Sequence, residues 1–430
     1  MTIEGTPGKQ TEEQAAITYL RQPQAIRDRA QQLFNLCQAD QLEHFSCDLA
    51  KLDEVATYVV ETTRQFYPDF DVPFHSRWRH FDVGGVPRLA RLKRVLQGEN
   101  SLTMARSQID LVIVSVLLDA GAGSQWRYRD LLTNQQWGNQ QQILQRSEGL
   151  AVASLRAFEQ GLFSSDPASP YQVDTDGLQQ LTQDGLAKAF QVSADNPLVG
   201  ISGRYELLQQ LGVALASQCD RFGQSPARPS NLLDYWMREG TIEEKNNTLD
   251  AGKLLSEVLE SFGSIWPGRV SIAQTNLGDV WPHPHLSDTA LGVNLVPFHK
   301  LSQWLTYSLV EPLTTAGITV TNLNALTGLA EYRNGGLCVD LGLLVPKHSA
   351  VTREPHLPGS PVVVEWRALT IVMLDLIGDR VRHLLNKSPE DLPLIKVLEG
   401  GTWAAGRRIA KHLRSTGMPP ITIQSDGTVF

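Results

Sequence analysis

The spacing of apolar residues indicates that most of this 430-residue chain is helical. Five long segments carry apolar side chains at three- and four-residue intervals, the period of a helix with one buried face. These segments are 23–38, 52–67, 177–190, 203–219 and 250–262. Strand-like patterns are few, and the best are "GSPVVVEW" at 359–366 and the tail "PPITIQSDGTVF" at 419–430. We therefore predict a mainly α fold with at most a small β element.

The chain contains no long interdomain linker and no sustained internal repeat. Residues 1–12 are polar and contain Gly and Pro, so we predict a mobile N-terminal arm there. Residues 13–430 are predicted to form a single compact helical domain. No run of about 18 uninterrupted apolar residues occurs, and the start lacks the basic and apolar regions of a signal peptide. We therefore expect a cytoplasmic protein that does not bind a membrane.

The charge balance argues against a nucleic-acid partner. Acidic residues outnumber basic ones, 46 to 38, which gives a formal net charge of −8. Binding to nucleic acid depends largely on neutralising phosphates, and such a chain offers no overall attraction for them. The stretch "RLARLKR" at 88–94 is locally basic, which is typical of a solvated helix face. We expect a small-molecule substrate, and the composition leaves the oligomeric state open.

Two Glu-x-Arg elements interrupt apolar stretches in the last third of the chain. They comprise Glu331, Tyr332, Arg333 and Asn334, and then Glu365, Trp366 and Arg367. Charge held against apolar surroundings is costly unless it is paired and hydrogen-bonded. Each element is therefore either an ion-pair staple in the core or part of a site where a carboxylate acts on a substrate.

The segment "VPFHKLSQWLTYSLVEPL" at 296–313 is a second candidate for chemistry. It is typical of a helix with an apolar face, and His299 and Gln303 lie on its polar face with Lys300 and Trp304 between them. An imidazole and an ammonium group near a helix N-terminus favour an anion such as a sugar phosphate. The alternative is a polar stripe that faces solvent.

Polar and aromatic residues also gather in two earlier segments. "VPFHSRW" contains His75 and Trp78, and "DAGAGSQWRY" contains Asp119, Trp126 and Tyr128. Glycines allow a backbone to approach a ligand and aromatic rings suit a planar group, although a buried helix with a glycine cap explains the second segment equally well. We predict that 73–80, 297–307 and 329–336 converge with 363–367 on a single pocket, because buried polar groups need partners or a common ligand.

Motifs for metal or covalent catalysis are weak or absent. His283 and His285 with Asp279 suggest metal ligands, but a short HxH spacing places no third ligand. The sequence has no GxSxG, P-loop or HExxH pattern. The four cysteines, Cys37, Cys47, Cys219 and Cys338, are scattered, and we predict reduced, buried thiols. We therefore predict no metal and no cofactor.

Six stretches together resemble the DUF1688 family over almost the whole chain. They are "DLVIVSVLLDAGAGSQWRY", "RSEGLAVASL", "NPLVGISGRYELL", "VPFHKLSQWLTYSL", "LTGLAEYRNGGL" and "LEGGTWAAGR". This resemblance implies a place in uracil breakdown, in which a ribosylated uracil is ring-opened and a ribosylurea-type intermediate must lose its urea. It does not by itself give a reaction.

A more distant similarity supplies one. Queuosine salvage proteins are all-helical N-glycoside hydrolases related to helix-hairpin-helix DNA glycosylases, and they carry an Asp-Tyr-Arg-Val-Pro-Gln motif followed by Glu-Ile-Arg. The stretches 331–336 and 365–367 resemble these motifs in order and separation, although Glu replaces Asp and the Val-Pro-Gln half is absent. The similarity implies a helix-hairpin-helix-type fold and an N-ribosyl hydrolase that acts on a ribosylurea-like nucleoside or its 5′-phosphate.

On this basis Glu331 and Glu365 are the predicted catalytic residues, because a carboxylate stabilises the oxocarbenium-like state of C1–N cleavage. The predicted substrate-binding residues are His75, Trp78, Asp119, Trp126, Tyr128, His299, Lys300, Gln303, Trp304, Tyr332, Arg333, Asn334 and Arg367. Two rival hypotheses stay open. One is a metal-dependent amidohydrolase that uses His283 and His285, and the other is a non-catalytic ligand-binding subunit.

Overall fold

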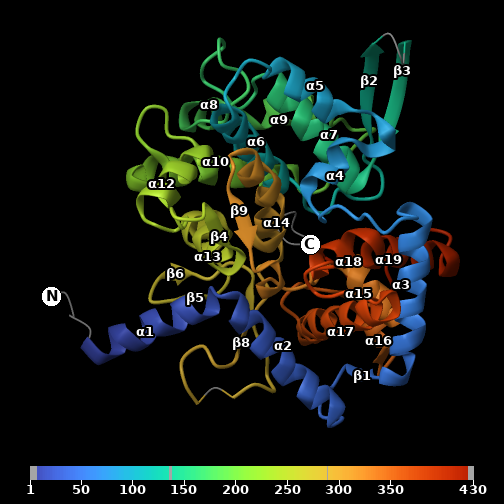
Figure 1. Ribbon diagram of the computed structural model, residues 1–430. Coiled ribbons are helices and arrows are strands. Elements are labelled where there is room, and N and C mark those ends of the chain that lie inside the picture. Colours follow the sequence, from blue (N-terminus) through green and yellow to red (C-terminus); the bar gives the residue numbers. More distant parts are fainter. Residues whose placement is uncertain (1–6, 135–137, 288, 425–430) are drawn as a thin grey trace.

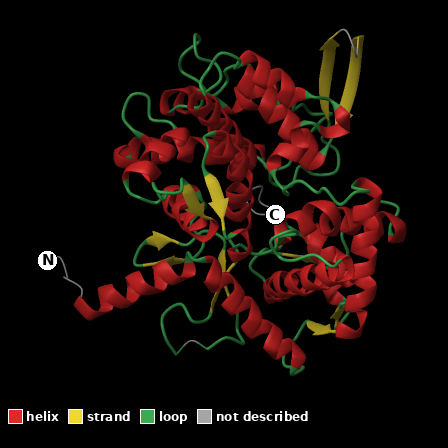
Figure 2. Ribbon diagram, in the orientation of Figure 1, coloured by secondary structure: helices red, strands yellow, loops and turns green. Residues whose placement is uncertain are grey.

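Helices dominate the computed structural model, which describes residues 7–134, 138–287 and 289–424 (Figures 1 and 2). The periodicity identified α2 (Pro23–Gln38), α3 (Leu52–Phe66), α10 (Ile201–Ser217) and α13 (Ala251–Phe262) to within two residues at each end. The segment 177–190 divides into α8 (Thr175–Gln180) and α9 (Gln183–Ala189). The division occurs because Thr182 starts a new helix, its side chain accepting a hydrogen bond from the Gly185 N–H.

Two helices at the centre of the molecule are buried over most of their length. In α6 (Ser101–Leu117) every residue from Ser107 to Leu117 is buried, and α6 packs against α14 (Lys300–Thr315). A helix that other elements cover on every side lies inside the protein, so these two form the middle of the core. Figure 1 shows α14 between the upper helices and the C-terminal group.

The C-terminal group brings together segments far apart in the sequence. It contains α15 (Tyr332–Asp340), α17 (Pro361–Leu385) and α19 (Trp403–Leu413), with α17 and α19 packed against α3 (Figure 1). The other helices are α1 (Pro7–Leu20), α4 (Arg77–Phe81), α5 (Arg88–Val95), α7 (Arg146–Glu159), α11 (Cys219–Phe222), α12 (Leu232–Arg238), α16 (Ala350–Arg353) and α18 (Leu394–Val397). Because α1 begins at Pro7, helix starts within the segment predicted as a mobile arm.

The prediction of a strand at 359–366 was wrong, since these residues start helix α17. Pro361 lies in the first turn, where proline loses only a hydrogen bond that has no helical partner. All residues from Val362 to Leu374 are buried, so packing against α2 and α3 outweighs the β preference of the three valines. In the described part of the tail, Thr422–Ile423 forms the strand, and residues 425–430 of the predicted segment lie outside the described residues.

The described strands are short and form two-stranded ladders, as the prediction of a small β element requires. The antiparallel pairs are β1 (Phe45–Cys47) with β10 (Leu344–Pro346), β2 (Tyr128–Asn134) with β3 (Gly138–Leu144), β5 (Ser271–Ile272) with β6 (Thr275–Asn276), and β7 (Val280–Pro282) with β8 (Leu295–Pro297). The parallel pairs are β4 (Thr248–Asp250) with β9 (Thr319–Thr321), and β11 (Pro355–His356) with β12 (Thr422–Ile423). Figure 2 shows that the longest pair, β2–β3, projects from the helical body.

Two further expectations can be compared with the fold. Within the described ranges no helix is long and apolar enough to cross a membrane. The prediction of four reduced, buried thiols needs correction, because Cys37 and Cys47 form a disulfide between the end of α2 and β1. Cys219 is exposed and free, and Cys338 is the buried free thiol of the described part. The spacing of Cys37 and Cys47 in sequence gave no sign that α2 and β1 would meet.

Candidate active site

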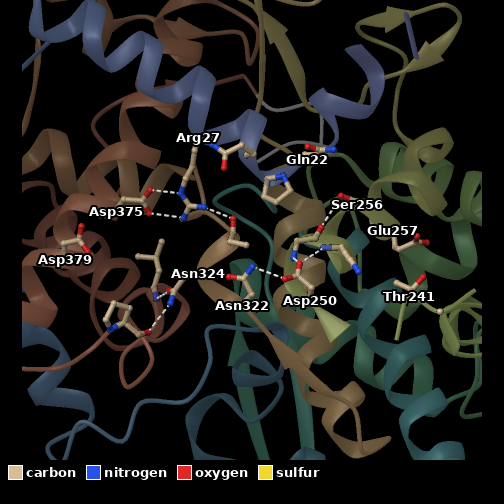
Figure 3. Close-up of a pocket in the computed structure, with 18 of the residues that line it drawn as sticks. Gln22, Arg27, Thr241, Asp250, Ser256, Glu257, Asn322, Asn324, Asp375 and Asp379 are labelled. Carbon is tan, nitrogen blue, oxygen red and sulfur yellow. Dashed lines mark hydrogen bonds and ion pairs between the residues drawn. The ribbon is translucent and has the colours of Figure 1, made fainter. Parts of the chain in front are cut away.

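Two of the cavities in the described part of the chain differ in what lines them. The larger, about 1070 Å³, lies where α2, α13 and α17 meet and contains none of the predicted site residues. Figure 3 shows that polar side chains around it bind one another: Arg27 pairs with Asp375, and Asn322 donates a hydrogen bond to Asp250. The smaller, about 370 Å³, is called the site cavity below. It is the better candidate because charged side chains converge on it from distant segments.

Seven of the predicted residues line the site cavity. They are His75, Asp119, Lys300, Trp304, Glu331, Tyr332 and Arg333. The cavity lies between α14, the start of α15 and the face of α19, and the loop after α6 closes another side. Three of the four segments expected to share one pocket, 73–80, 297–307 and 329–336, therefore do so.

Asp119 reaches the cavity because a buried cation holds the end of α6 in place. The fully buried Arg77 of α4 forms an ion pair with Asp119 at 2.9 Å and donates from Nε to Ser115 Oγ at 2.8 Å. Ser147, the second residue of α7, donates its hydroxyl to the same carboxylate at 2.8 Å. Burial opposes ionisation of Asp119, but the effect of Arg77 and the other cations nearby is larger and lowers the pKa of this carboxyl.

The glycine-rich loop after Asp119 is fixed by a second buried arginine. Arg204 of α10 donates to the carbonyl oxygens of Leu118 at 3.0 Å, Ala120 at 2.6 Å and Gly121 at 3.1 Å. These carbonyls follow the last turn of α6 and would otherwise lack helical partners. These hydrogen bonds therefore fix the backbone of the loop, which itself lines the cavity.

Glu331 stands at the N-terminus of α15 and has a structural role there. Its Oε2 accepts from the Arg333 N–H at 2.7 Å and its Oε1 accepts from the Asn334 N–H at 2.6 Å. The carboxylate thus caps the helix while it also lines the cavity. Burial raises the pKa of Glu331, although the two backbone hydrogen bonds and Lys300 oppose the rise.

Lys300 is the first residue of α14 and presents its ammonium group to the cavity. Its backbone N–H donates to Asp279, but its Nζ has no hydrogen-bond or ion-pair partner among the described residues. Burial lowers the pKa of Lys300, and the nearby carboxylates of Asp119 and Glu331 oppose the effect. A partly buried ammonium group that makes no direct contact with an acceptor is costly for a purely structural residue, so its position favours a ligand.

One wall of the cavity is built from aromatic and imidazole rings. The His75 ring lies 4.6 Å from that of Trp304, and the His80 ring lies 5.5 Å from that of Trp403. His75 is oriented by Glu399, whose Oε2 lies 2.7 Å from His75 Nδ1. Glu399 belongs to a π-helical turn, Leu398–Thr402, an irregularity that is common at functional sites. The wall offers flat surfaces against which a planar group can stack.

His80 is held neutral beside these rings. Burial, together with the neighbouring Arg77 guanidinium, lowers the pKa of His80 to about 4. Its Nδ1 lies 3.1 Å from Ser147 Oγ, which also contacts Asp119. The Ser147 hydroxyl donates its hydrogen bond to the Asp119 carboxylate and not to the His80 imidazole. Ser147, His80 and Asp119 therefore lack the arrangement of a nucleophilic serine and its base.

Glu365, the second predicted catalytic residue, does not line the site cavity. Glu365 is fully buried in α17, where Oε2 accepts from the His44 N–H at 3.1 Å and Oε1 lies 3.5 Å from His283 Nε2. Arg367 likewise lies outside the site cavity and forms an ion pair with Asp279 at 2.7 Å, which lowers the pKa of that carboxyl despite its burial. The two Glu-x-Arg elements therefore do not share one site.

Six other predicted substrate-binding residues also lie outside the cavity, and five of them place polar atoms on partners in the core. Trp78 donates to Ser308 O at 2.7 Å, and Trp126 donates to Phe190 O at 2.9 Å. His299 Nε2 lies 2.8 Å from Leu20 O, and Gln303 pairs with Thr327. Asn334 donates to Leu329 O at 3.1 Å. Tyr128 is buried at the start of strand β2.

Several cavity residues were missed by the sequence analysis. They are His80, Arg146, Ser147, Glu148, Trp403 and Arg407. All but His80 lie in "RSEGLAVASL" or "LEGGTWAAGR", stretches that carry the family resemblance but have no recognisable chemical motif. These stretches contain glycine and other small residues, which favour close packing. The polar residues next to them were the signal from which the sequence could have indicated site residues. Gly406 shows such packing, since a Cβ there would lie 2.2 Å from Arg333 O.

The described residues do not assemble a metal centre. The rings of His283 and His285 lie 5.5 Å apart, and no group of three His, Cys, Asp or Glu side chains in the described ranges is arranged to hold a metal ion. His283 instead faces Glu365.

The chain matches known proteins over almost its whole length. The family described as "Protein of unknown function (DUF1688)" matches residues 19–430. The chain belongs to the DUF1688 family. It is 43% identical over 417 residues to Protein urg3 of Schizosaccharomyces pombe, with 95% of this chain and 97% of the relative covered. It is 38% identical over 444 residues to Uracil catabolism protein 4 of Lachancea kluyveri, with 96% and 99% covered.

Proposed function

We propose that this DUF1688 protein acts in uracil catabolism as an N-ribosyl hydrolase that releases urea from a ribosylurea-like substrate. The name of one full-length relative, Uracil catabolism protein 4, supports the pathway. Opening the ring of a ribosylated uracil leaves a urea group on the anomeric carbon of ribose. The resemblance of 331–336 to N-glycosidase motifs supports cleavage of the bond between that carbon and the nitrogen.

The observation that carries the proposal is a pair of carboxyl groups in one cavity with pKa values shifted in opposite directions. The pKa of Glu331 is raised by burial, whereas that of Asp119 is lowered, against burial, by Arg77 and other cations. Two such groups can divide acid and base work between them. Glu331 then protonates the leaving urea, and ionised Asp119 stabilises the positive charge that develops on the ribose.

The other groups of the cavity fit this chemistry. Lys300 lines the same cavity as both carboxylates and can stabilise negative charge on the departing urea oxygen. The ring faces of His75, His80, Trp304 and Trp403 suit a planar urea and exclude water from one side. The overall reaction adds one water: its hydroxyl forms the new bond to C1, the C1–N bond breaks, and the nitrogen takes up a proton.

The test is an assay of the purified full-length protein with synthetic N-ribosylurea and with its 5′-phosphate. The proposal predicts that reducing sugar and urea appear in equal amounts and faster than in a blank without protein. Asp119→Asn should lower the rate by at least about a hundredfold, since removing one electrostatic contact at a transition state costs this much. Ammonia without urea would indicate attack on the ureide instead, and binding without turnover would leave a ligand-binding subunit.

A further inference from the structure

One end of the site cavity gathers three guanidinium groups, and we call it the arginine end. Arg146 comes from the start of α7, Arg333 from α15 and Arg407 from α19, and all three line the cavity. They are close enough to repel one another: the pKa of Arg333 is lowered first by burial, and Arg146 and Arg407 lower it further. Like charges gathered at a partly enclosed site destabilise the empty protein unless something negative compensates.

The protein compensates this charge only in part. Arg407 pairs with Glu148 at 2.6 Å and stacks over Trp403 at 4.7 Å. Arg333 donates to Gly417 O at 2.8 Å, which is a neutral acceptor. Arg146 contacts only Met418 Sδ, at 3.7 Å, and has no carboxylate partner within the described ranges. Three cations therefore face one paired carboxylate, and the surplus is about the charge of a phosphate monoester.

The start of helix α7 adds to the same attraction. Its first three residues, Arg146, Ser147 and Glu148, line the cavity, and the preceding Gln145 makes no side-chain hydrogen bond to cap the helix. The free N–H groups of a helix N-terminus and its dipole favour a bound anion. A guanidinium group binds phosphate more favourably than it binds a carboxylate, because phosphate presents more than one pair of oxygens to its parallel N–H donors.

We propose that the arginine end binds a phosphate group, so that the substrate of this protein is a sugar phosphate ester and not a neutral nucleoside. This inference rests on the proposed function for the rest of the substrate, because Asp119, Lys300 and Glu331 must meet the ribose when the phosphate is bound. It assigns Arg146 and Arg407 to substrate recognition together with Arg333. It also moves the anion away from His299, where the sequence analysis expected a sugar phosphate, since the His299 ring nitrogen contacts Leu20 O instead.

Binding is tested first, without any turnover. Ribose 5-phosphate, inorganic phosphate and ribose are titrated into the full-length protein by calorimetry at constant ionic strength, because salt screens exposed charge. Ribose 5-phosphate and phosphate should bind, and ribose should bind at least about tenfold more weakly than its phosphate, as expected for one lost set of charge-assisted hydrogen bonds. Equal affinity for ribose and ribose 5-phosphate would overturn the inference.

The variant Arg146→Gln then locates the binding. This residue has no ion pair to lose among the described residues, so folding should be preserved, and affinity for ribose 5-phosphate should fall by at least about tenfold. Arg94→Gln, which removes an exposed arginine of α5, removes the same charge elsewhere and should leave the affinity unchanged. Should Arg146→Gln fail to fold, Arg407→Lys keeps the charge, loses the fork and should still weaken binding. Unchanged affinity in the folded variant would refute the site.

Turnover separates this inference from the proposed function. If the protein hydrolyses N-ribosylurea and its 5′-phosphate with equal kcat/KM, the arginine end is not a phosphate site, although the hydrolase proposal stands. If it binds ribose 5-phosphate through Arg146 but cleaves neither compound, the phosphate site stands and the hydrolase proposal fails. If both are correct, kcat/KM for the phosphate ester is higher, and Arg146→Gln reduces that preference by at least about tenfold.

Discussion

Replacing Glu331 by Gln separates its two roles, helix cap and acid. Gln has nearly the same shape and keeps one carbonyl oxygen, so it can accept one of the two hydrogen bonds from the Arg333 and Asn334 N–H groups. It cannot supply a proton or a negative charge to a substrate. The substitution therefore removes the whole chemical function but only part of the cap.

The expected sizes differ enough to be measured separately. Loss of part of a cap costs about 1 kcal/mol of folding free energy, and relief of a desolvated charge offsets some of this cost. Loss of the acid should lower ribose release by at least about a hundredfold, equivalent to about 2.7 kcal/mol of transition-state stabilisation. Both are measured on one preparation, by urea unfolding and by a reducing-sugar assay normalised to folded protein.

Glu365→Gln is the matched control. Glu365 is also buried and also accepts a backbone N–H, from His44, but it does not line the site cavity. It should lose a similar amount of stability and keep its activity per folded molecule. If Glu331→Gln loses stability and still releases ribose at the parent rate, Glu331 is a helix cap alone and the proposed acid is wrong.

Three other perturbations follow from the site. Lys300→Met removes a cation whose Nζ has no partner among the described residues. Urea unfolding should therefore show unchanged or slightly higher stability, while ribose release falls by about a hundredfold. A clear loss of stability would contradict this prediction. Asp119→Asn leaves Arg77 buried without its ion-pair partner and should lower the free energy of unfolding by about 3 kcal/mol in the same assay. An unchanged free energy of unfolding would show that this ion pair does not stabilise the fold. For His80, whose pKa is about 4 in the fold against an ordinary 6.5, the unfolded chain takes up the proton first as the pH falls. Stability should then drop between these two values by about 3 kcal/mol, and unfolding across that range should show a smaller drop in His80→Gln.

Periodicity located the main helices because one buried face at a 3.6-residue period is a local property of the sequence. It failed at 359–366, where every side of α17 is buried and three valines match a strand as well as a core helix. Packing with α2 and α3 decided that segment, and those contacts join residues some 300 positions apart. Local patterns cannot report them.

The site was predictable to the extent that residue type limits what a side chain can do. Glu331, Lys300 and Asp119 stood out because each places charge beside apolar sequence, and all three line one cavity. Trp78, Trp126 and His299 were equally reasonable candidates, but each finds a backbone carbonyl inside the core. Whether a buried polar group meets a ligand or a carbonyl depends on tertiary contacts. The sequence therefore could not separate the two sets.

The most direct test of the central claim follows the fate of urea. Ribosylurea 5′-phosphate labelled with ¹⁵N at both nitrogens is incubated with the purified protein, and the products are identified by mass spectrometry. The account predicts intact, doubly labelled urea in equal amount with ribose 5-phosphate, and at least about a hundredfold slower release of both products by Glu331→Gln. Labelled ammonia with no urea, or intact substrate after prolonged incubation with folded protein, would contradict it.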